Sequence, residues 1–251
     1  MFDYRHQLDG KIALITGAAA RIGATTARYL HSAGCDVILH YRNSADRALA
    51  LASELNEDRP DSAFTLQGDL ADRDGLEPMA KAAVALRGHV DILINNASSY
   101  YPTPIGSVTQ SQWDDLFASN ARGPFFLSQA LAPALKEREG CIVNLVDIHA
   151  DRPNANHPVY SMAKAANAMM VKALARDLAP DVRVNGVAPG AALWPEHFFD
   201  DEDRQEILRR IPLGRPAGAE QIAQAVLFMV AGTDYVTGQI LAVDGGRSVQ
   251  Q

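Results

Sequence analysis

The stretch Lys11-Ile-Ala-Leu-Ile-Thr16-Gly17-Ala-Ala-Ala-Arg21-Ile-Gly23 decides the fold of this chain. Its first half is a short apolar run, which is typical of a β-strand buried on both faces of a sheet. Two glycines follow, and residues 24–33 continue with the composition of a helix. Glycines let a backbone approach a pyrophosphate, and the start of a helix holds the anion, so the stretch predicts a dinucleotide site. The middle glycine of the usual G-x-G-x-x-G is missing, so an ordinary strand-to-helix turn remains the alternative at this point.

Further apolar runs and helical stretches alternate along the rest of the chain. The strands that we predict are residues 11–16, 35–40, 63–67, 91–94, 141–146, 182–188 and 239–243. The helical stretches are 24–33, 45–56, a run from about 73, 113–135, 160–178 and 221–230. This rhythm predicts an α/β protein with a doubly wound, parallel, seven-stranded sheet and helices on both faces. Without a repeat or a linker, residues 1–251 are expected to form a single domain.

The composition narrows the class of protein. The chain has 251 residues, 47% of them hydrophobic, which is enough for a full core. A net charge of −7 gives no basic face for nucleic acid, and no apolar run reaches the roughly 18 residues of a membrane span. The start lacks the apolar block of a secretion signal, and both cysteines fall in strand-like runs, so we expect a cytoplasmic protein. The seven histidines show no metal-ligand grouping, and no Gly-x-Ser-x-Gly elbow is present, so no metal is expected.

Tyr160 and Lys164 form a candidate catalytic pair. The spacing Tyr-x-x-x-Lys places both side chains on one face of a helix, one turn apart. A free tyrosine has a pKa of about 10, and a nearby ammonium is expected to lower that pKa. The pair would then exchange a proton with a substrate at neutral pH. A solvated helix face is the plain alternative for this spacing alone.

The segment after the second strand indicates the cofactor. It reads His40-Tyr41-Arg42-Asn43-Ser44, with no acid until Asp46, and Arg21 is close enough to help. An acid at this place favours the 2′-hydroxyl of NAD, whereas a 2′-phosphate needs cationic and hydroxyl donors. We therefore expect NADPH, although Arg42 as a solvated loop charge is the alternative.

Polar residues follow several of the other predicted strands. In such sheets ligands lie beyond the carboxyl ends of the strands, so these residues should line the site. The segments are Asp69-Leu70, the loop from Asn95 to Pro104, Asp147, and Pro189-Gly190. Asp69 could accept a hydrogen bond from an adenine or cap the helix expected near Arg73. The stretch 191–212 has loop and short-helix character and could fold over a substrate.

Taken together, five motifs resemble the short-chain dehydrogenase/reductase family along nearly the whole chain. They are Thr16-Gly17-x-x-x-Arg21-x-Gly23, Asn95-Asn96-Ala97, Asn120, Tyr160-x-x-x-Lys164 and Pro189-Gly190. The resemblance implies a Rossmann-type fold, a nicotinamide cofactor and a homotetramer. The cofactor contacts that it implies, together with those expected above, are Gly17, Arg21, Ile22, Gly23, His40, Tyr41, Arg42, Asn43, Ser44, Asp69, Leu70, Asn96, Ala97, Ser98, Lys164, Pro189 and Gly190.

Asp147 departs from the common pattern of that family. Most members place a serine thirteen positions before the tyrosine, and here that position holds Asp147. An ionised carboxylate cannot donate a hydrogen bond to a carbonyl, so a substrate with N–H donors, or one that needs a proton at a ring nitrogen, is favoured over a ketone. This aspartate, the segment 40–44 and the loop 96–104 resemble the pteridine reductases, and bacterial dihydromonapterin reductase is similar too.

That resemblance assigns roles to individual residues. Asp147 and Tyr160 with Lys164 would be catalytic, and Asn120 would support the helix and a water chain behind Lys164, a plain structural hydrogen bond being the alternative. Tyr100 would stack on the pterin, although the subfamily often has phenylalanine there. The implied substrate contacts are Arg21, Ser98, Tyr100, Asp147, Tyr160, Leu193 and Trp194.

The expected function is NADPH-dependent reduction of dihydropterins, with biopterin or dihydrofolate as further candidates, to the tetrahydro form. A general carbonyl reductase of the 3-oxoacyl type is one alternative. A non-catalytic dinucleotide-binding sensor is another.

Overall fold

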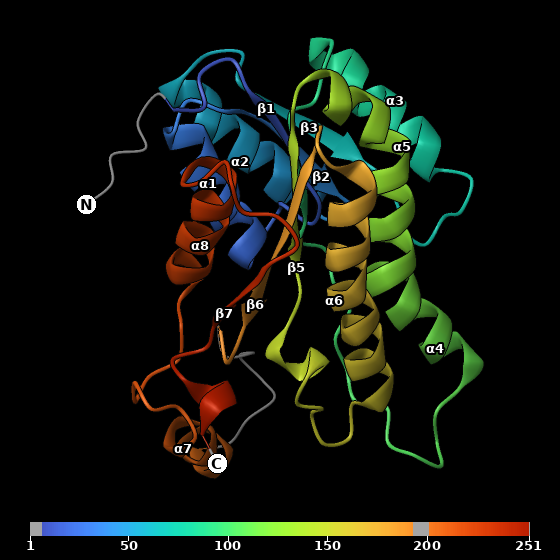
Figure 1. The fold of residues 1–251 in the computed structure, drawn as a ribbon, viewed down its shortest axis with the longest axis vertical. Coiled ribbons are helices and arrows are strands. Elements are labelled where there is room, and N and C mark those ends of the chain that lie inside the picture. Colours follow the sequence, from blue (N-terminus) through green and yellow to red (C-terminus); the bar gives the residue numbers. More distant parts are fainter. Residues whose placement is uncertain (1–6, 193–200, 251) are drawn as a thin grey trace.

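The computed structural model describes residues 7–192 and 201–250, and within them one parallel sheet organises the chain. Its strands are β1 (Ile12–Ile15), β2 (Asp36–Tyr41), β3 (Ala63–Gln67), β4 (Ile92–Asn95), β5 (Cys141–Leu145), β6 (Arg183–Pro189) and β7 (Ile240–Val243). Their spatial order is β3-β2-β1-β4-β5-β6-β7, and every neighbouring pair is parallel. The predicted Rossmann-type, doubly wound fold is confirmed (Figure 1).

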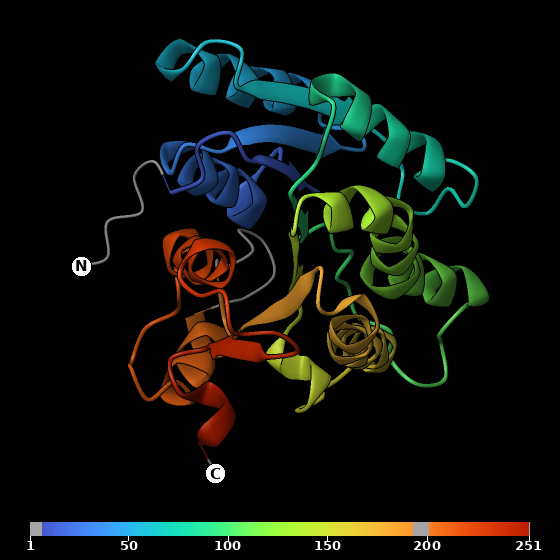
Figure 2. The ribbon, with the colours of Figure 1, turned by 45° about the horizontal axis from the view of Figure 1, so that its top comes forward.

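Helices cover both faces of this sheet (Figures 1 and 2). One layer consists of α1 (Arg21–Ser32), α2 (Ala45–Asp58) and α8 (Ala219–Ala231). The other consists of α3 (Leu76–Arg87), α5 (Gly123–Glu137) and α6 (Pro158–Leu178). The helix α4 (Gln110–Phe117) continues into α5 through a π-helical turn, Ala118–Arg122, and α7 (Asp201–Arg209) lies beside the C-terminal segment.

Alternate side chains of β1 point to opposite faces of the sheet, and both faces are buried. This explains why the sequence of the strand is continuously apolar. Ala13 and Ile15 pack into the layer of α1, α2 and α8, whereas Ile12 and Leu14 pack into the layer of α3, α5 and α6. All four are almost fully buried. Burying a large aliphatic side chain contributes about 1.5–3 kcal/mol, so both faces of the sheet stabilise the fold.

Two predicted helices begin three residues from where they were expected. The helix expected near Arg73 begins at Leu76, with Gly75 as its N-cap. Asp69 therefore does not cap it; its carboxylate accepts a hydrogen bond from the N–H of Ala71 (2.9 Å) in the preceding turn. The helical run expected from Trp113 begins at Gln110, because a capping box fixes its start.

Two further observations concern the described residues only. No helix in residues 7–192 and 201–250 is long and apolar enough to cross a membrane. Within the same residues, no three His, Cys, Asp or Glu side chains gather in a way that would hold a metal ion. Leu193 and Trp194, which were expected to contact substrate, lie outside the described residues.

The order of the strands explains where a ligand can bind. The chain moves from β1 outward to β3, then returns to the other side of β1 and continues from β4 to β7. The connections after β1 and β4 therefore leave the sheet in opposite directions. In open α/β sheets a crevice forms at such a switch point, at the carboxyl ends of the strands.

Candidate active site

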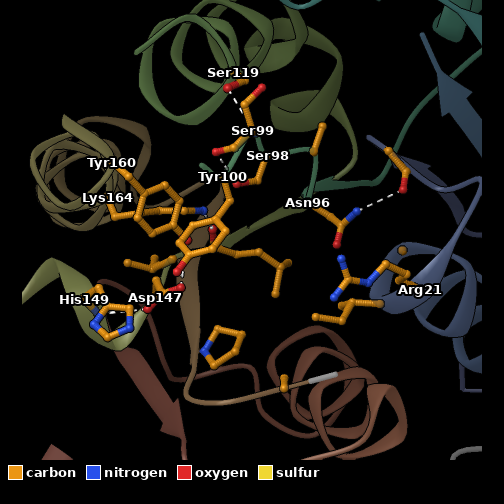
Figure 3. A pocket seen from close by; sticks show the side chains of 18 of the residues that line it. Arg21, Asn96, Ser98, Ser99, Tyr100, Ser119, Asp147, His149, Tyr160 and Lys164 are labelled. Carbon is orange, nitrogen blue, oxygen red and sulfur yellow. Dashed lines mark hydrogen bonds between the residues drawn. The ribbon is translucent and has the colours of Figure 1, made fainter. Parts of the chain in front are cut away.

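A cleft of about 680 Å³ lies at this switch point (Figure 3). Its volume is within the range of small-molecule and cofactor sites. On one side, which we call the glycine side, it is lined by the turn Gly17–Gly23, by His40 and Arg42, and by Asn96. On the other, which we call the tyrosine side, it is lined by Tyr100, Asp147, Tyr160, Lys164 and Arg247. Figure 3 shows Arg21 and Asn96 across the cleft from Asp147 and Tyr160.

The turn leaves no room for a Cβ atom at its two glycines, Gly17 and Gly23. Gly17 has a φ of 65°, in the left-handed region, and a Cβ built there would lie 3.0 Å from the Cα of Ala97. A Cβ on Gly23 would overlap the carbonyl oxygen of Gly17 and lie 2.6 Å from Nδ2 of Asn96. Asn96 Nδ2 donates to the carbonyl oxygens of Thr16 (2.8 Å) and Gly17 (3.1 Å), which fixes the turn against the β4 loop. Such a turn, followed directly by the start of α1, fits a dinucleotide pyrophosphate.

Arg21 occupies an unusual backbone conformation within that turn. Its φ of 52° is positive, which is uncommon for a residue with a side chain. It lies at the first position of α1 and lines the cleft. The side chain is thereby presented at the cleft wall beside the glycine turn (Figure 3).

His40 lines the cleft but is occupied by the protein itself. Its Nδ1 accepts a hydrogen bond from the N–H of Gly17 (3.2 Å), and its Nε2 lies 3.1 Å from the carbonyl oxygen of Gly68. Both contacts are satisfied by the neutral ring with the proton on Nε2. Burial lowers the pKa of His40 to about 4, so at neutral pH the ring carries no charge for a phosphate. His40 therefore positions the glycine turn.

Of the other residues expected at the end of β2, Arg42 alone lines the cleft. Its Nη1 lies 4.0 Å from Oδ1 of Asp69, and both side chains are partly exposed. Tyr41, Asn43 and Ser44 are not on the cleft wall, and Ser44 is the N-cap residue of α2. The remaining cofactor positions from the sequence do line it, namely Ile22, Leu70, Ala97, Ser98, Pro189 and Gly190.

Asp147 and Tyr160 are in direct contact on the tyrosine side. Tyr160 Oη donates a hydrogen bond of 2.7 Å to Oδ2 of Asp147. Oδ1 of Asp147 accepts from the N–H of His149 (2.8 Å), because Asp147 is the N-cap of a short 3-10 helix that follows β5. Tyr160 is in the first turn of α6, which begins at Pro158, where a proline needs no hydrogen-bond donor. Each oxygen of the Asp147 carboxylate therefore accepts one hydrogen bond, and together the two bonds fix the carboxylate beside the phenol.

Lys164 lies one turn further along α6 and is almost fully buried. Its Nζ donates a hydrogen bond of 2.8 Å to the carbonyl oxygen of Leu145, at the end of β5. Burial lowers the pKa of Lys164 to about 8, and the charge of Asp147 opposes this shift. At neutral pH the ammonium form still predominates.

The expectation that Lys164 lowers the pKa of Tyr160 is wrong for this arrangement. Burial raises the pKa of Tyr160 well above 10, and the adjacent carboxylate of Asp147 raises it further. The physical reason is that the carboxylate contacts the phenol directly, whereas the ammonium contacts a backbone carbonyl. Tyr160 therefore keeps its proton at neutral pH.

Asn120 lies within the π-helical turn and is fully buried. Its Oδ1 accepts a hydrogen bond from Ser98 Oγ (2.7 Å), and its Nδ2 donates to the carbonyl oxygen of Ser99 (3.0 Å). Its own carbonyl oxygen accepts from Nδ2 of Asn167 on α6 (2.8 Å). Asn120 does not line the cleft, so it positions the loop after β4 relative to α6.

Two buried asparagines extend this network across the sheet. Asn95 Nδ2 donates to Oδ1 of Asn144 (2.9 Å), and Asn144 Nδ2 donates to Oδ1 of Asn167 (3.0 Å). A chain of amides therefore connects β4, β5, α6 and the π-helical turn. Because a buried amide without a partner is costly, this chain fixes the relative positions of the elements that carry Ser98 and Lys164.

Tyr100 projects over the catalytic pair. Its ring stacks on His157 (centroids 4.7 Å apart, planes 9° apart) and meets the ring of Tyr160 edge to face (4.8 Å, 81°). Its hydroxyl accepts a hydrogen bond from Nδ2 of Asn154 (2.9 Å). With 45% of the residue exposed, the aromatic side chain remains available at the cleft mouth. His157 covers one face of it, which the sequence did not predict.

Other cleft residues were also missed by sequence reasoning. They are polar or charged side chains from separate loops and from α7, namely Asn154, Glu206, Arg210 and Arg247. None belongs to a motif with characteristic spacing.

Comparison with known proteins identifies the family. The model of the family described as enoyl-(acyl carrier protein) reductase matches residues 17–248. The chain belongs to the short-chain dehydrogenase/reductase family. Short-chain dehydrogenases/reductases are NAD(P)H-dependent oxidoreductases, and the glycine turn described above fits such a cofactor.

Three relatives are similar over nearly their whole length. Pteridine reductase 1 of Leishmania tarentolae is 37% identical over 281 aligned residues, which cover 95% of this chain and 96% of the relative. The 3-oxoacyl-[acyl-carrier-protein] reductase FabG of Staphylococcus aureus strain Mu50 is 33% identical, covering 94% and 97%. The uncharacterized oxidoreductase YmfI of Bacillus subtilis is also 33% identical, covering 94% and 98%.

Proposed function

We propose that this short-chain dehydrogenase/reductase is an NADPH-dependent pteridine reductase that acts on dihydropterins or dihydrofolate. The observation that carries the proposal is the 2.7 Å hydrogen bond between Tyr160 and the carboxylate of Asp147. Asp147 replaces the serine that most of the family use to hold a carbonyl oxygen. A carboxylate accepts hydrogen bonds and does not donate them, so it suits the N–H groups of a nitrogen heterocycle.

The protein's part in the reaction follows from the positions of three side chains. The cofactor supplies a hydride to a ring carbon of a C=N bond, and the neighbouring nitrogen must receive a proton. Tyr160 keeps its proton at neutral pH and is the proposed donor, and the ammonium of Lys164 beside its ring stabilises the phenolate that the transfer leaves. Asp147 accepts hydrogen bonds from the N–H groups of the heterocycle and thereby orients it. The same carboxylate accepts the hydrogen bond of the Tyr160 hydroxyl and so fixes the position of the phenol. Lys164, with a pKa of about 8, provides the positive charge at the base of the site.

The preference for NADPH rests on the charges of the glycine side. Arg42 and Arg21 both line the cleft where the 2′-phosphate of the adenosine ribose is expected. Asp69 lies 4.0 Å from Arg42 and would accept a hydrogen bond from the adenine amino group, as its place after β3 suggests. His40 is left out of phosphate binding because its ring is neutral and engaged.

We further propose that residues 1–251 form one NADP-binding domain that acts in the cytoplasm as a homotetramer. Exposed apolar side chains on α5 and α6 support self-association, because burying them in an interface removes apolar surface from water. They are Phe125, Phe126, Met162 and Met169. Sedimentation equilibrium tests the assembly independently of the activity.

A general carbonyl reductase is the competing function, and the similarity to 3-oxoacyl-[acyl-carrier-protein] reductases favours it. The experiment that separates the two is NADPH consumption measured in parallel with dihydrobiopterin, dihydromonapterin, dihydrofolate and a 3-oxoacyl thioester. We expect kcat/KM for at least one dihydropterin or dihydrofolate to exceed that for the thioester by about a hundredfold or more. Faster reduction of the thioester would establish the carbonyl reductase. If NADPH is consumed in none of the mixtures, the dinucleotide-binding sensor remains as the function.

A further inference from the structure

Arg247 is the charged residue on the tyrosine side of the cleft that the proposed reaction does not use. It begins a 3-10 turn, Arg247–Val249, directly after the double glycine Gly245–Gly246, which follows β7 and Asp244. The turn is held by Asp244, which accepts hydrogen bonds from the N–H groups of Gly246 (2.9 Å) and Ser248 (2.6 Å). The backbone that presents Arg247 to the cleft is therefore well fixed.

In the part of the chain that the structure describes, residues 7–192 and 201–250, the guanidinium of Arg247 makes no hydrogen bond or ion pair. Two acids, Asp147 and Asp244, attract it without bonding to it. Both oxygens of Asp147 accept from Tyr160 and His149, and both oxygens of Asp244 accept from backbone N–H groups.

A partly buried arginine without a partner is energetically unfavourable. Burial lowers the pKa of Arg247, and the charge of Asp147, followed by Tyr100 and Asp244, opposes this shift. Arg210 also lowers the pKa of Arg247, and it is itself hydrogen-bonded to Glu206 (2.9 and 2.6 Å). Among the described residues, Arg247 is thus the arginine of the tyrosine side that has no hydrogen bond or ion pair of its own.

We propose that Arg247 determines substrate specificity by binding an anionic group, a carboxylate or a phosphate, on the side chain of the heterocyclic substrate. A guanidinium presents five N–H donors in a planar fork that matches both anions. Arg247 lies on the same wall as Asp147 and Tyr100, so a heterocycle held there directs its substituent toward the C-terminal turn. This inference rests on the proposed function, because it assumes that the heterocycle binds at Asp147.

The test compares Arg247→Gln and Arg247→Lys with Arg209→Gln. Arg209 also binds Glu206 on α7 (2.8 Å) but does not line the cleft, so it is a control for the loss of one positive charge nearby. The substrates are dihydrofolate, with a carboxylate side chain, dihydroneopterin monophosphate, and dihydrobiopterin, whose side chain is uncharged. We expect Arg247→Gln to raise KM for at least one anionic substrate by about tenfold, with kcat and the KM for dihydrobiopterin little changed. Arg247→Lys should restore part of the difference, and Arg209→Gln should show none.

The comparison between dihydrofolate and dihydroneopterin monophosphate identifies which anion Arg247 binds. The substrate whose KM rises more in Arg247→Gln carries that anion. Equal changes for all three substrates, or no change, would overturn the inference. If the wild-type enzyme reduces no pterin, the proposed function fails, and the inference is decided by calorimetric titration with dihydrofolate. Tighter binding to wild type than to Arg247→Gln would retain Arg247 as an anion-binding residue, and equal or absent binding would remove it.

Discussion

On the glycine side of the cleft, the side-chain amide of Asn96 holds the backbone carbonyl oxygen of Gly17, whereas on the tyrosine side the side chains of Asp147 and Tyr160 bond to each other and Arg247 lines the same cleft. The first group lies within a short distance of the central strands β1 and β4. The second comes from the end of β5, from α6 and from the C-terminal turn. The glycine turn belongs to the dinucleotide site of this type of fold, whereas the side chains that contact a substrate differ between proteins of one fold. The difference explains why the family is evident from the glycine side, whereas the substrate depends on the tyrosine side.

The largest effect is expected from removing the proton donor of the tyrosine side. Replacing Tyr160 with phenylalanine removes the hydroxyl that contacts Asp147 and should lower kcat for pterin reduction roughly a thousandfold, the usual scale of general acid catalysis. The dissociation constant for NADPH, measured by fluorescence titration, should stay near that of wild type. A Tyr160→Phe enzyme with nearly normal kcat would show that another group supplies the proton.

The next effect concerns the glycine side and the pH. Because the pKa of His40 is lowered to about 4 in the folded protein, the unfolded chain binds a proton at a higher pH than the folded one. This histidine therefore contributes stability that is present above pH 6.5 and is lost as the pH falls toward 4, roughly 3 kcal/mol in all. Urea unfolding between pH 7 and 4.5 should show a steeper loss for wild type than for His40→Gln. Parallel pH profiles would contradict the assignment.

A smaller effect is expected from filling the glycine turn. Gly23→Ala places a methyl group against the carbonyl oxygen of Gly17 and Nδ2 of Asn96, which should cost about 2 kcal/mol and weaken NADPH binding about tenfold. Once saturated with NADPH, the variant should keep most of its kcat, because the tyrosine side is unchanged. Gly88→Ala is the control for a general loss of stability: at a φ of 86° the substitution strains the C-cap of α3, but the position is away from the cleft and NADPH affinity should not change. An equal loss of NADPH affinity in both variants would show that the turn is not specific.

The same difference decides how much could be predicted from the sequence. The strands, the glycine turn and the pair Tyr160–Lys164 follow from local spacing, and the structure places them as expected. Arg247 and Asn154 line the cleft because loops that are distant in sequence pack together there, and no local sequence pattern predicts that packing. The pKa of Tyr160 was predicted in the wrong direction because spacing along a helix indicates proximity to Lys164 but not the closer contact with Asp147.

His40 shows the limit of reading a cofactor segment by residue type. Its place after the second strand suggested a phosphate contact, whereas its ring is engaged by Gly17 and Gly68. Arg42, in the same segment, does reach the cleft wall. Residue type could not separate the two, because both line the cleft and only the contacts of His40 with Gly17 and Gly68, which are distant in sequence, engage its ring.

The central claim is that the carboxylate of Asp147 selects a nitrogen heterocycle, and the substitution Asp147→Ser tests it most directly. Serine restores the hydroxyl that most of the family carry at this position. The measurement is kcat/KM for the best dihydropterin substrate, together with the dissociation constant for NADPH. The account predicts a fall of about a hundredfold in kcat/KM with little change in NADPH binding. Undiminished pterin reduction by Asp147→Ser would contradict it.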